Sequence, residues 1–168
     1  MHGLQQWRRR LAVMGLAGLI PIGLGSMAMS QNQAVAPAKE TIFARKILMD
    51  TIGHNMDELE TMTASAKIDL AEGNEHADLV SVMLMAFPHM FPPATNQWKP
   101  NVERDPGTDT FAAPEVWSNY PDFYTRAKAA AQVAYKASRA ENEATFKGLI
   151  EELRVACDSC HAVYMKKE

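Results

Sequence analysis

The chain has 168 residues, of which 47% are apolar and 22% are charged, values that are ordinary for a globular protein. Its formal net charge of −3 argues against nucleic acid as a partner, because the phosphate backbone is bound by basic surfaces. No stretch alternates apolar and polar residues for long enough to predict a sheet, so we expect an all-α protein.

The first thirty residues have the pattern of a secretory signal peptide. Three consecutive arginines at 8–10 precede an apolar run at 11–24, and small residues follow up to Ser30. A basic segment, a short apolar segment and small residues before the cleavage site define such a signal. We predict cleavage after Ser30, with Ala36 as a weaker alternative.

The alternative for this segment is a membrane anchor. The apolar run is shorter than the roughly 20 residues that a spanning helix needs, and Pro21 interrupts it. We therefore expect a periplasmic protein without a stable membrane anchor. The mature domain at 31–168 keeps 14 basic and 20 acidic residues, which gives it a formal charge of −6.

Two helices are predicted in the first half of the mature chain. One covers 38–66 and the other covers 74–87, with Gly73 and Asn74 between them. Apolar residues of the first helix recur at heptad-like spacing, as expected for a bundle: Ile42, Met49, Ile52, Met56 and Leu59.

A long connection follows, and then two more helices. Six prolines and one glycine at 88–114 exclude a regular helix there. Pro114 suits the first turn of a third helix, whose inward residues continue to Ala137, and a fourth helix begins near Asn142. The prediction is an antiparallel four-helix bundle with a long loop between helices two and three.

Cys157, Cys160 and His161 form the C-x-x-C-H sequence of covalent haem attachment. Positions i, i+3 and i+4 share one face of a helix, so both thiols can bond to the vinyl groups of a porphyrin while the imidazole reaches the iron. We predict one haem c, with His161 as an iron ligand. The alternatives are a disulfide, which this spacing makes sterically poor, a zinc site, which lacks further paired ligands, and a thioredoxin-like redox pair, which lacks a preceding strand.

With these residues in view, the mature chain resembles the cytochrome c′ family, the class II c-type cytochromes. The resemblance covers most of 38–168 and depends on the order of several landmarks: residues 45–49, Phe91 and Pro92 before the loop, residues 114–117 with Phe123, and the C-x-x-C-H helix. It implies a four-helix bundle with its haem near the C-terminus.

The resemblance also implies that one position in the first helix divides the family by function. An aliphatic residue there leaves the iron five-coordinate and high-spin, and such proteins bind nitric oxide or carbon monoxide. A methionine makes the iron six-coordinate and low-spin, which suits electron transfer. Residues 47–49, Ile-Leu-Met, resemble the methionine-ligated branch, so we predict Met49 as the second axial ligand. The alternative is that Met49 only fills the core.

Arg45 lies one turn before Met49 on the same stripe. An inward arginine needs a partner, and a haem propionate would accept its hydrogen bonds. In relatives an arginine here lies close to the haem, which supports this assignment; the alternative is that the side chain reaches solvent at the end of the bundle. Met165 stands where relatives commonly carry an arginine, which puts the proximal ligand chemistry of the gas-binding branch in doubt.

The predicted function is a periplasmic electron carrier that serves redox partner proteins. We do not expect an enzyme, because no distal acid–base pair is recognisable. The alternative is a five-coordinate protein that binds or scavenges nitric oxide or carbon monoxide. A homodimer is left open: relatives often pair through their first two helices, but charged residues here give no clear hydrophobic patch, namely Asp57, Glu58, Glu60, Lys67 and Asp69.

Overall fold

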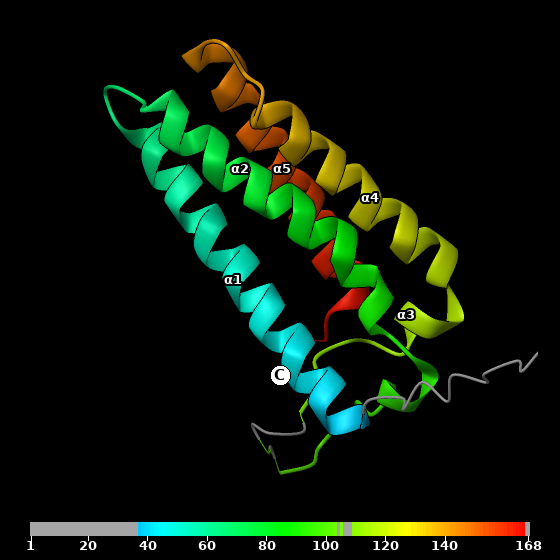
Figure 1. The fold of residues 1–168 in the computed structure, drawn as a ribbon. Helices are drawn as coiled ribbons and strands as arrows, with labels where there is room; N and C mark the ends of the chain where they lie inside the picture. The colour runs from blue at the N-terminus through cyan, green and yellow to red at the C-terminus, as the bar shows by residue number, and fades with distance from the viewer. Residues whose placement is uncertain (1–36, 104, 106–108, 167–168) are drawn as a thin grey trace, which may run out of the picture. The chain divides into compact units, whose positions relative to one another are not determined.

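Four long helices make up most of residues 37–103, 105 and 109–166, the part of the chain that the computed structural model describes. They are α1 (Ala38–Ala64), α2 (Leu70–Ala86), α4 (Tyr120–Ala137) and α5 (Glu143–Tyr164). The four form an antiparallel bundle, which confirms the predicted fold (Figure 1). The predicted signal segment at 1–30 lies outside the described residues.

Polar side chains begin two of these helices. The Asp69 carboxylate accepts hydrogen bonds from the backbone N–H groups of Ala71 and Glu72, and the Asn142 side chain accepts one from Thr145. Such caps satisfy donors that have no partner within the helix. The predicted start of the second helix at residue 74 is therefore wrong, because the Asp69 cap starts α2 at Leu70 and Gly73 lies inside its first turn.

The crossover between α2 and α4 contains short helical turns. They are the 3₁₀ turns η1 (Phe87–Met90) and η2 (Pro93–Thr95) and the single-turn helix α3 (Glu115–Ser118). The sequence predicts one continuous third helix from Pro114, whereas the structure breaks it at Asn119. Pro121 explains the break, since it has no N–H to donate to the preceding turn and is tolerated only where a helix begins.

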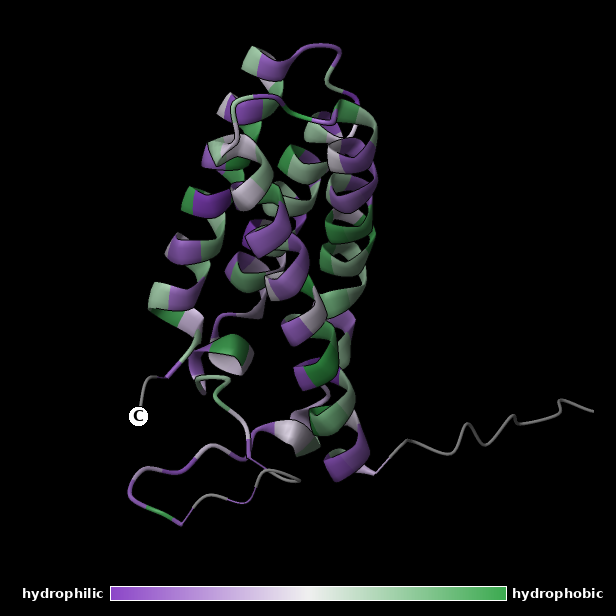
Figure 2. Ribbon diagram, turned by 90° about the vertical axis from the view of Figure 1, so that its left-hand side faces the viewer, coloured by the Kyte–Doolittle hydropathy of each residue, from purple (hydrophilic) through white to green (hydrophobic). Residues whose placement is uncertain are grey.

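Apolar residues from all four long helices fill the core. Hydrophobic and hydrophilic residues alternate along each helix (Figure 2), as a bundle with one buried face per helix requires. The largest side chains that are fully buried in the helical core are Ile42, Met56, Leu59, Val80, Phe146, Ile150 and Leu153. A second cluster near the crossover contains Phe91, Val116, Phe123 and Tyr164.

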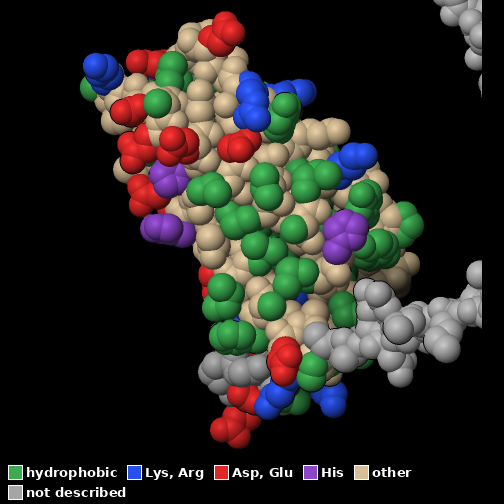
Figure 3. Space-filling view, viewed as in Figure 1, with side chains coloured by type: hydrophobic (Ala, Val, Ile, Leu, Met, Phe, Trp, Pro, Cys, Tyr) green, Lys and Arg blue, Asp and Glu red, His purple; other side chains and the backbone are tan. Residues whose placement is uncertain are grey.

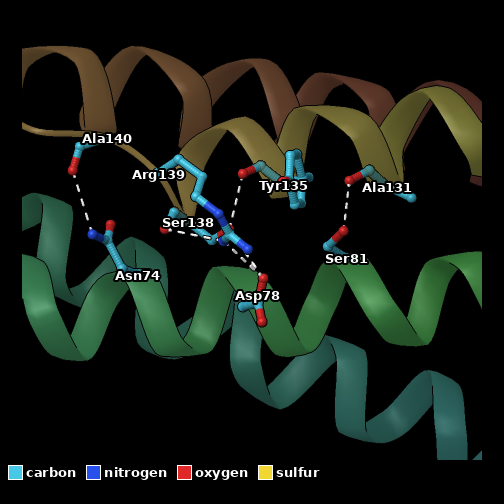
Figure 4. Close-up of polar contacts among 8 residues, drawn as sticks. All are labelled: Asn74, Asp78, Ser81, Ala131, Tyr135, Ser138, Arg139 and Ala140. Carbon is cyan, nitrogen blue, oxygen red and sulfur yellow. Dashed lines mark hydrogen bonds and ion pairs between the residues drawn. The ribbon is translucent and has the colours of Figure 1, made fainter. Parts of the chain in front are cut away.

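Polar contacts reinforce the packing of α2 against α4 (Figure 4). The Ser81 hydroxyl donates to the carbonyl of Ala131 at 2.9 Å, and it is buried. Nearer the turn that follows α4, Arg139 forms an ion pair with Asp78 at 3.0 Å. Both contacts join α2 to residues of α4 or the turn after it, and neither touches α1.

The helices do not all contact one another equally. α2 packs extensively on α1 and α4, and α4 packs on α5, whereas α1 meets α5 over a much smaller area. This leaves space between α1 and α5 at the end of the bundle where the crossover passes. None of the helices in the described part of the chain is both long and apolar enough to cross a membrane.

Gly73 gives a test of the packing between α2 and α5. A Cβ at this position would lie 2.6 Å from Cζ of Phe146, whose ring is fully buried, so the ring or a helix would have to shift. We expect Gly73→Ala to lower the free energy of unfolding by about 1–3 kcal/mol. At the exposed Gly148 a Cβ would meet no atom within 4 Å, so Gly148→Ala should raise that free energy by about 0.5–1 kcal/mol. Urea unfolding measures both, and a stabilised Gly73→Ala variant would contradict the packing described here.

Candidate functional site

A cavity of about 310 Å³ lies between α1, α4 and α5 at the crossover end of the bundle. Its wall is largely apolar and includes side chains of the core, such as Ile52, Leu84 and Phe123. The cavity is lined by all five residues that the sequence predicts for the site: Arg45, Met49, Cys157, Cys160 and His161. Residues that are more than one hundred positions apart in the chain are thus brought to one place.

α5 supplies the two thiols and the imidazole. Cys157 and Cys160 are half-buried free thiols one helical turn apart, and His161 follows directly. Burial raises the pKa of the Cys157 thiol and raises the pKa of Cys160 to about 11. Burial lowers the pKa of His161, which favours the neutral imidazole that can donate an electron pair to a metal.

α1 supplies a thioether to the same cavity. Met49 is half-buried and packs against the helical core while also lining the cavity. Met56, two turns further along α1, is buried and lines the cavity as well. His54 is exposed, in agreement with its predicted place on the surface. α1 therefore offers two sulfur atoms to the cavity, of which Met49 is the predicted ligand.

Arg45 is buried at the same wall, one turn before Met49. Its guanidinium donates hydrogen bonds to the Thr95 hydroxyl at 2.8 Å, the Thr95 carbonyl at 3.2 Å and the Thr110 hydroxyl at 2.5 Å. Its Cζ atom lies 4.6 Å from the centroid of the Phe91 ring and 5.6 Å from that of Trp117. The side chain is only 3% exposed, so the alternative in which it reaches solvent is wrong.

The charge of Arg45 has no acidic partner among the described residues. Its hydrogen bonds go to neutral hydroxyl and carbonyl oxygens, and burial lowers the pKa of its guanidinium to about 10. The group is still a cation at neutral pH. A buried cation at a cavity wall favours an anionic ligand, because an uncompensated buried charge is costly.

The crossover is joined to the end of α5 beside the cavity. The backbone N–H of Ala113 donates to the carbonyl of Tyr164 at 2.9 Å, and that of Lys166 donates to the carbonyl of Phe111 at 2.8 Å. These bonds form an isolated antiparallel bridge between Ala112 and Met165. The segment that follows His161 is therefore held by the segment that follows Thr110.

Two arginines of the cavity wall were missed by the sequence analysis. Arg126 comes from α4, and Arg154 comes from α5, where it forms an ion pair with Glu60 of α1. The position of Arg154 in the cavity wall could have been predicted, because Arg154 lies three residues before Cys157 and so shares its helical face. Arg126 directly precedes Ala127, an inward residue of α4, but neighbouring positions on a helix point in different directions.

A hydrogen-bonded network links Arg126 to the end of α5. The Tyr164 hydroxyl donates to the Asp122 carboxylate at 2.5 Å, and Nε of Arg126 donates to the same oxygen at 2.7 Å. These two bonds, the first being the larger cause, hold the pKa of the Asp122 carboxyl below its usual range. The network fixes Tyr164, which also lines the cavity, one turn beyond Cys160.

These residues fit a c-type haem. Two thiols at the spacing of the attachment sequence, an adjacent imidazole and a thioether from another helix line one apolar cavity. The buried guanidinium at its wall lacks an anionic partner in the described chain, and a propionate is such an anion. No cluster of three or more His, Cys, Asp or Glu side chains suited to a metal ion occurs among the described residues.

Comparisons with known proteins agree with this chemistry. The sequence model of the family described as cytochrome C′ matches residues 40–165. A cytochrome c-556 of Agrobacterium tumefaciens (strain II Chrys) is 29% identical over 127 residues, which are 74% of this chain and 95% of that protein.

Solved structures also resemble the chain. Cytochrome c′ from Rubrivivax gelatinosus has a TM-score of 0.66 and 24% identity, over 78% of this chain and 98% of that one. The nitric oxide complex of the L16I mutant of cytochrome c prime from Alcaligenes xylosoxidans has a TM-score of 0.65 and 17% identity, over 79% and 98% of the two chains.

The Asp122 network predicts a pH dependence of stability. Because the folded-state pKa of Asp122 is depressed, its stabilising effect is present above the ordinary carboxyl pKa of about 4 and is lost as the pH falls through the lower, folded-state value. Asp122→Asn should therefore lower the melting temperature at pH 6, and the difference from wild type should shrink on acidification. Glu151→Gln removes an exposed carboxylate of α5 and serves as the control. A difference that is the same at all pH values would contradict the shift.

Proposed function

Because the chain belongs to the cytochrome c′ family, the class II c-type cytochromes, we propose that it transfers single electrons through a haem whose iron is bound by His161 and Met49. Members of this family carry haem c, and one covalently attached haem is expected in this chain. The observation that carries the proposal is that Met49 lines the same cavity as Cys157, Cys160 and His161.

The two cysteines, His161 and Met49 have different roles in binding the haem and its iron. Cys157 and Cys160 form the two thioether bonds that hold the haem, which supplies reversible one-electron chemistry when bound. His161 gives the iron a nitrogen ligand, and its lowered pKa keeps the imidazole neutral for that purpose. Met49 gives a neutral sulfur ligand, and an axial methionine raises the reduction potential relative to more basic ligands. The largely apolar wall suits the apolar face of a porphyrin.

Arg45 is proposed as the partner of a haem propionate. Its guanidinium is buried, positively charged and hydrogen-bonded to neutral oxygens, so a carboxylate at the cavity wall would compensate its charge. The exposed cations of the surface have no comparable need for an anion, because water solvates them.

The second candidate function is binding of nitric oxide or carbon monoxide to a five-coordinate iron. Gly53 favours it, because this residue lines the cavity one turn beyond Met49 and a Cβ there would meet no atom within 4 Å. Gly53 thus leaves this part of the cavity wall without a side chain. The nitric oxide complex of a cytochrome c prime mutant is one of the structures that the chain resembles. In both candidates the protein is a carrier or binding protein, and no catalytic residue is proposed.

We further propose that the protein is exported to the periplasm and exchanges electrons with redox partner proteins. The signal pattern that ends at Ser30 supports export, and the formal charge of −6 for residues 31–168 suits a partner with a basic surface.

A homodimer stays a prediction, but the surface of the first two helices is less polar than the sequence suggested. Side chains of α1 and α2 gather into an apolar patch (Figure 3). The exposed large hydrophobic residues of these two helices are Phe43, Ile47, Leu79, Val82 and Met85. The charged residues named in the sequence analysis lie elsewhere, in the C-terminal part of α1 and in the turn between α1 and α2.

Covalent attachment is tested at the two cysteines. The double variant Cys157→Ser/Cys160→Ser, expressed with a haem-maturation system, should release all its haem on acid–acetone extraction, whereas each single variant keeps one thioether bond. Ser159→Ala is the control, since Ser159 lies between them but is exposed and bonds only to its own helix. Mass spectrometry should find one haem on the control. A wild-type haem that is extractable would contradict the attachment.

Ligation is tested at Met49. Met49→Ala should turn a low-spin ferric absorption spectrum into a high-spin one, because it removes the sulfur ligand. Carbon monoxide then no longer has to displace a ligand, so it should bind the ferrous form more than about tenfold faster. A tenfold change corresponds to only about 1.4 kcal/mol. Met56→Leu is the matched control on the same helix and should keep the low-spin spectrum. A wild-type protein that is already high-spin would instead support the gas-binding candidate.

A further inference from the structure

α1 and α5, which carry the two proposed iron ligands, have little direct contact with each other. Ion pairs between them join Arg154 to Glu60 and Asp57, which lie two or three turns beyond Met49 along α1. At the Met49 end, a chain of contacts through the crossover joins the two helices instead. We propose that Thr110 is the positioning residue of this connection, and that it holds the Met49 face of α1 in register with His161.

The first half of the connection runs from α1 to the crossover. Arg45 lies one turn before Met49, and its guanidinium donates to the Thr110 hydroxyl at 2.5 Å. The same group donates to the Thr95 hydroxyl and lies against the Phe91 and Trp117 rings. A planar cation held by several bonds and two rings has little rotational freedom, so α1 is fixed at this point.

The second half runs from the crossover to α5. The Thr110 hydroxyl oxygen also accepts a hydrogen bond from the backbone N–H of Ala112 at 3.1 Å. Ala112 is paired with Met165 in the antiparallel bridge, whose two bonds are made by residues 111–113 and 164–166. The N–H of Met165 in turn donates to the carbonyl of His161 at 3.1 Å.

Thr110 is the point where the two halves meet. A hydroxyl oxygen has two acceptor sites, and here one accepts from Arg45 and the other from Ala112. The residue is buried, so water does not replace either bond when the hydroxyl is removed. We call Arg45, Thr110 and residues 111–113 and 164–166 the α1–α5 link. This link ends one turn from each proposed ligand, at the crossover end of the bundle in Figure 1.

The inference rests on the proposed ligation by Met49 and His161. Its consequence is that the sulfur reaches the iron only while the link holds α1 in place. Loss of the Thr110 hydroxyl leaves a donor of the buried guanidinium without a partner, and α1 relaxes away from α5. The haem stays attached, because the cysteines are untouched, but the iron becomes partly five-coordinate.

The experiment uses the haem-loaded protein and the nearly isosteric variant Thr110→Val. We expect a high-spin fraction in the ferric spectrum and carbon monoxide binding to the ferrous form that is about tenfold faster, a change equivalent to about 1.4 kcal/mol. Hydrogen exchange of the Ala113 and Lys166 amides, which make the bridge, should speed up by a similar factor of about ten. Thr110→Ser keeps the hydroxyl and should restore wild-type behaviour in all three measurements.

Ser81→Ala is the matched control. It also removes a buried hydroxyl and its hydrogen bond, but between α2 and α4 and away from the link (Figure 4). It should lower the melting temperature while leaving spin state, gas binding and the two amides unchanged. If Thr110→Val yields no haem-loaded protein, Thr95→Val takes its place, because it removes another hydroxyl acceptor of the same guanidinium.

The outcomes separate this inference from the proposed function. A high-spin wild type contradicts ligation by Met49 and removes the role of the link with it. A low-spin wild type with an equally low-spin Thr110→Val variant and an unchanged carbon monoxide rate overturns the positioning role alone. A Ser81→Ala variant with the same spectral change also overturns it, because the effect would then be a general loss of stability.

Discussion

The buried guanidinium of Arg45 is the interaction on which the functional end of the bundle depends. Removing a charged group from water costs several kcal/mol, which only well-placed partners offset. Those partners come from the crossover: both oxygens of Thr95, the Thr110 hydroxyl and the faces of two aromatic rings. Arg45 thus helps to hold the long connection between α2 and α4 against α1, although this connection contains little regular structure.

A cavity is present at one end of the bundle because α1 and α5 have little direct contact there. α2 and α4 pack closely on their neighbours, whereas the contact between α1 and α5 is much less extensive. Side chains of both helices point into this space without filling it, among them Met49 from α1 and Cys160 from α5. A bundle with direct contact between α1 and α5 along its whole length would have no room for a porphyrin. The cavity therefore lies where α1 and α5 do not pack directly on each other.

Features that depend only on the periodicity of a single helix could be predicted from the sequence. The i, i+3, i+4 spacing of Cys157, Cys160 and His161 and the inward stripe of α1 required only helical periodicity, and the structure brings both to one cavity. The wrong predictions of helix boundaries arose where two local features of the sequence indicated different structures. Gly73 indicated a break, but the Asp69 cap and the close approach of Phe146 place it inside α2. Pro121 divided a helix that the inward spacing of its residues made look continuous.

Contacts between segments that are far apart in the sequence could not be predicted from it. The inward position of Arg45 followed from its stripe, but nothing in the sequence paired it with Thr95 and Thr110, which are 50 and 65 residues away. The position of Arg126 in the cavity wall depends on the rotation of α4 about its axis, which neighbouring helices decide. Periodicity in a single sequence predicts which face of each helix is buried. The packing of helices and loops then determines which polar groups contact one another.

The most direct measurement of the central claim is iron K-edge X-ray absorption on the purified ferric protein, because it identifies the atoms bound to the iron without reference to spin state. The account predicts one sulfur neighbour besides the nitrogens of the porphyrin and of His161, and the loss of that sulfur in Met49→Ala. An iron in the wild-type protein that is surrounded by nitrogen alone would contradict it.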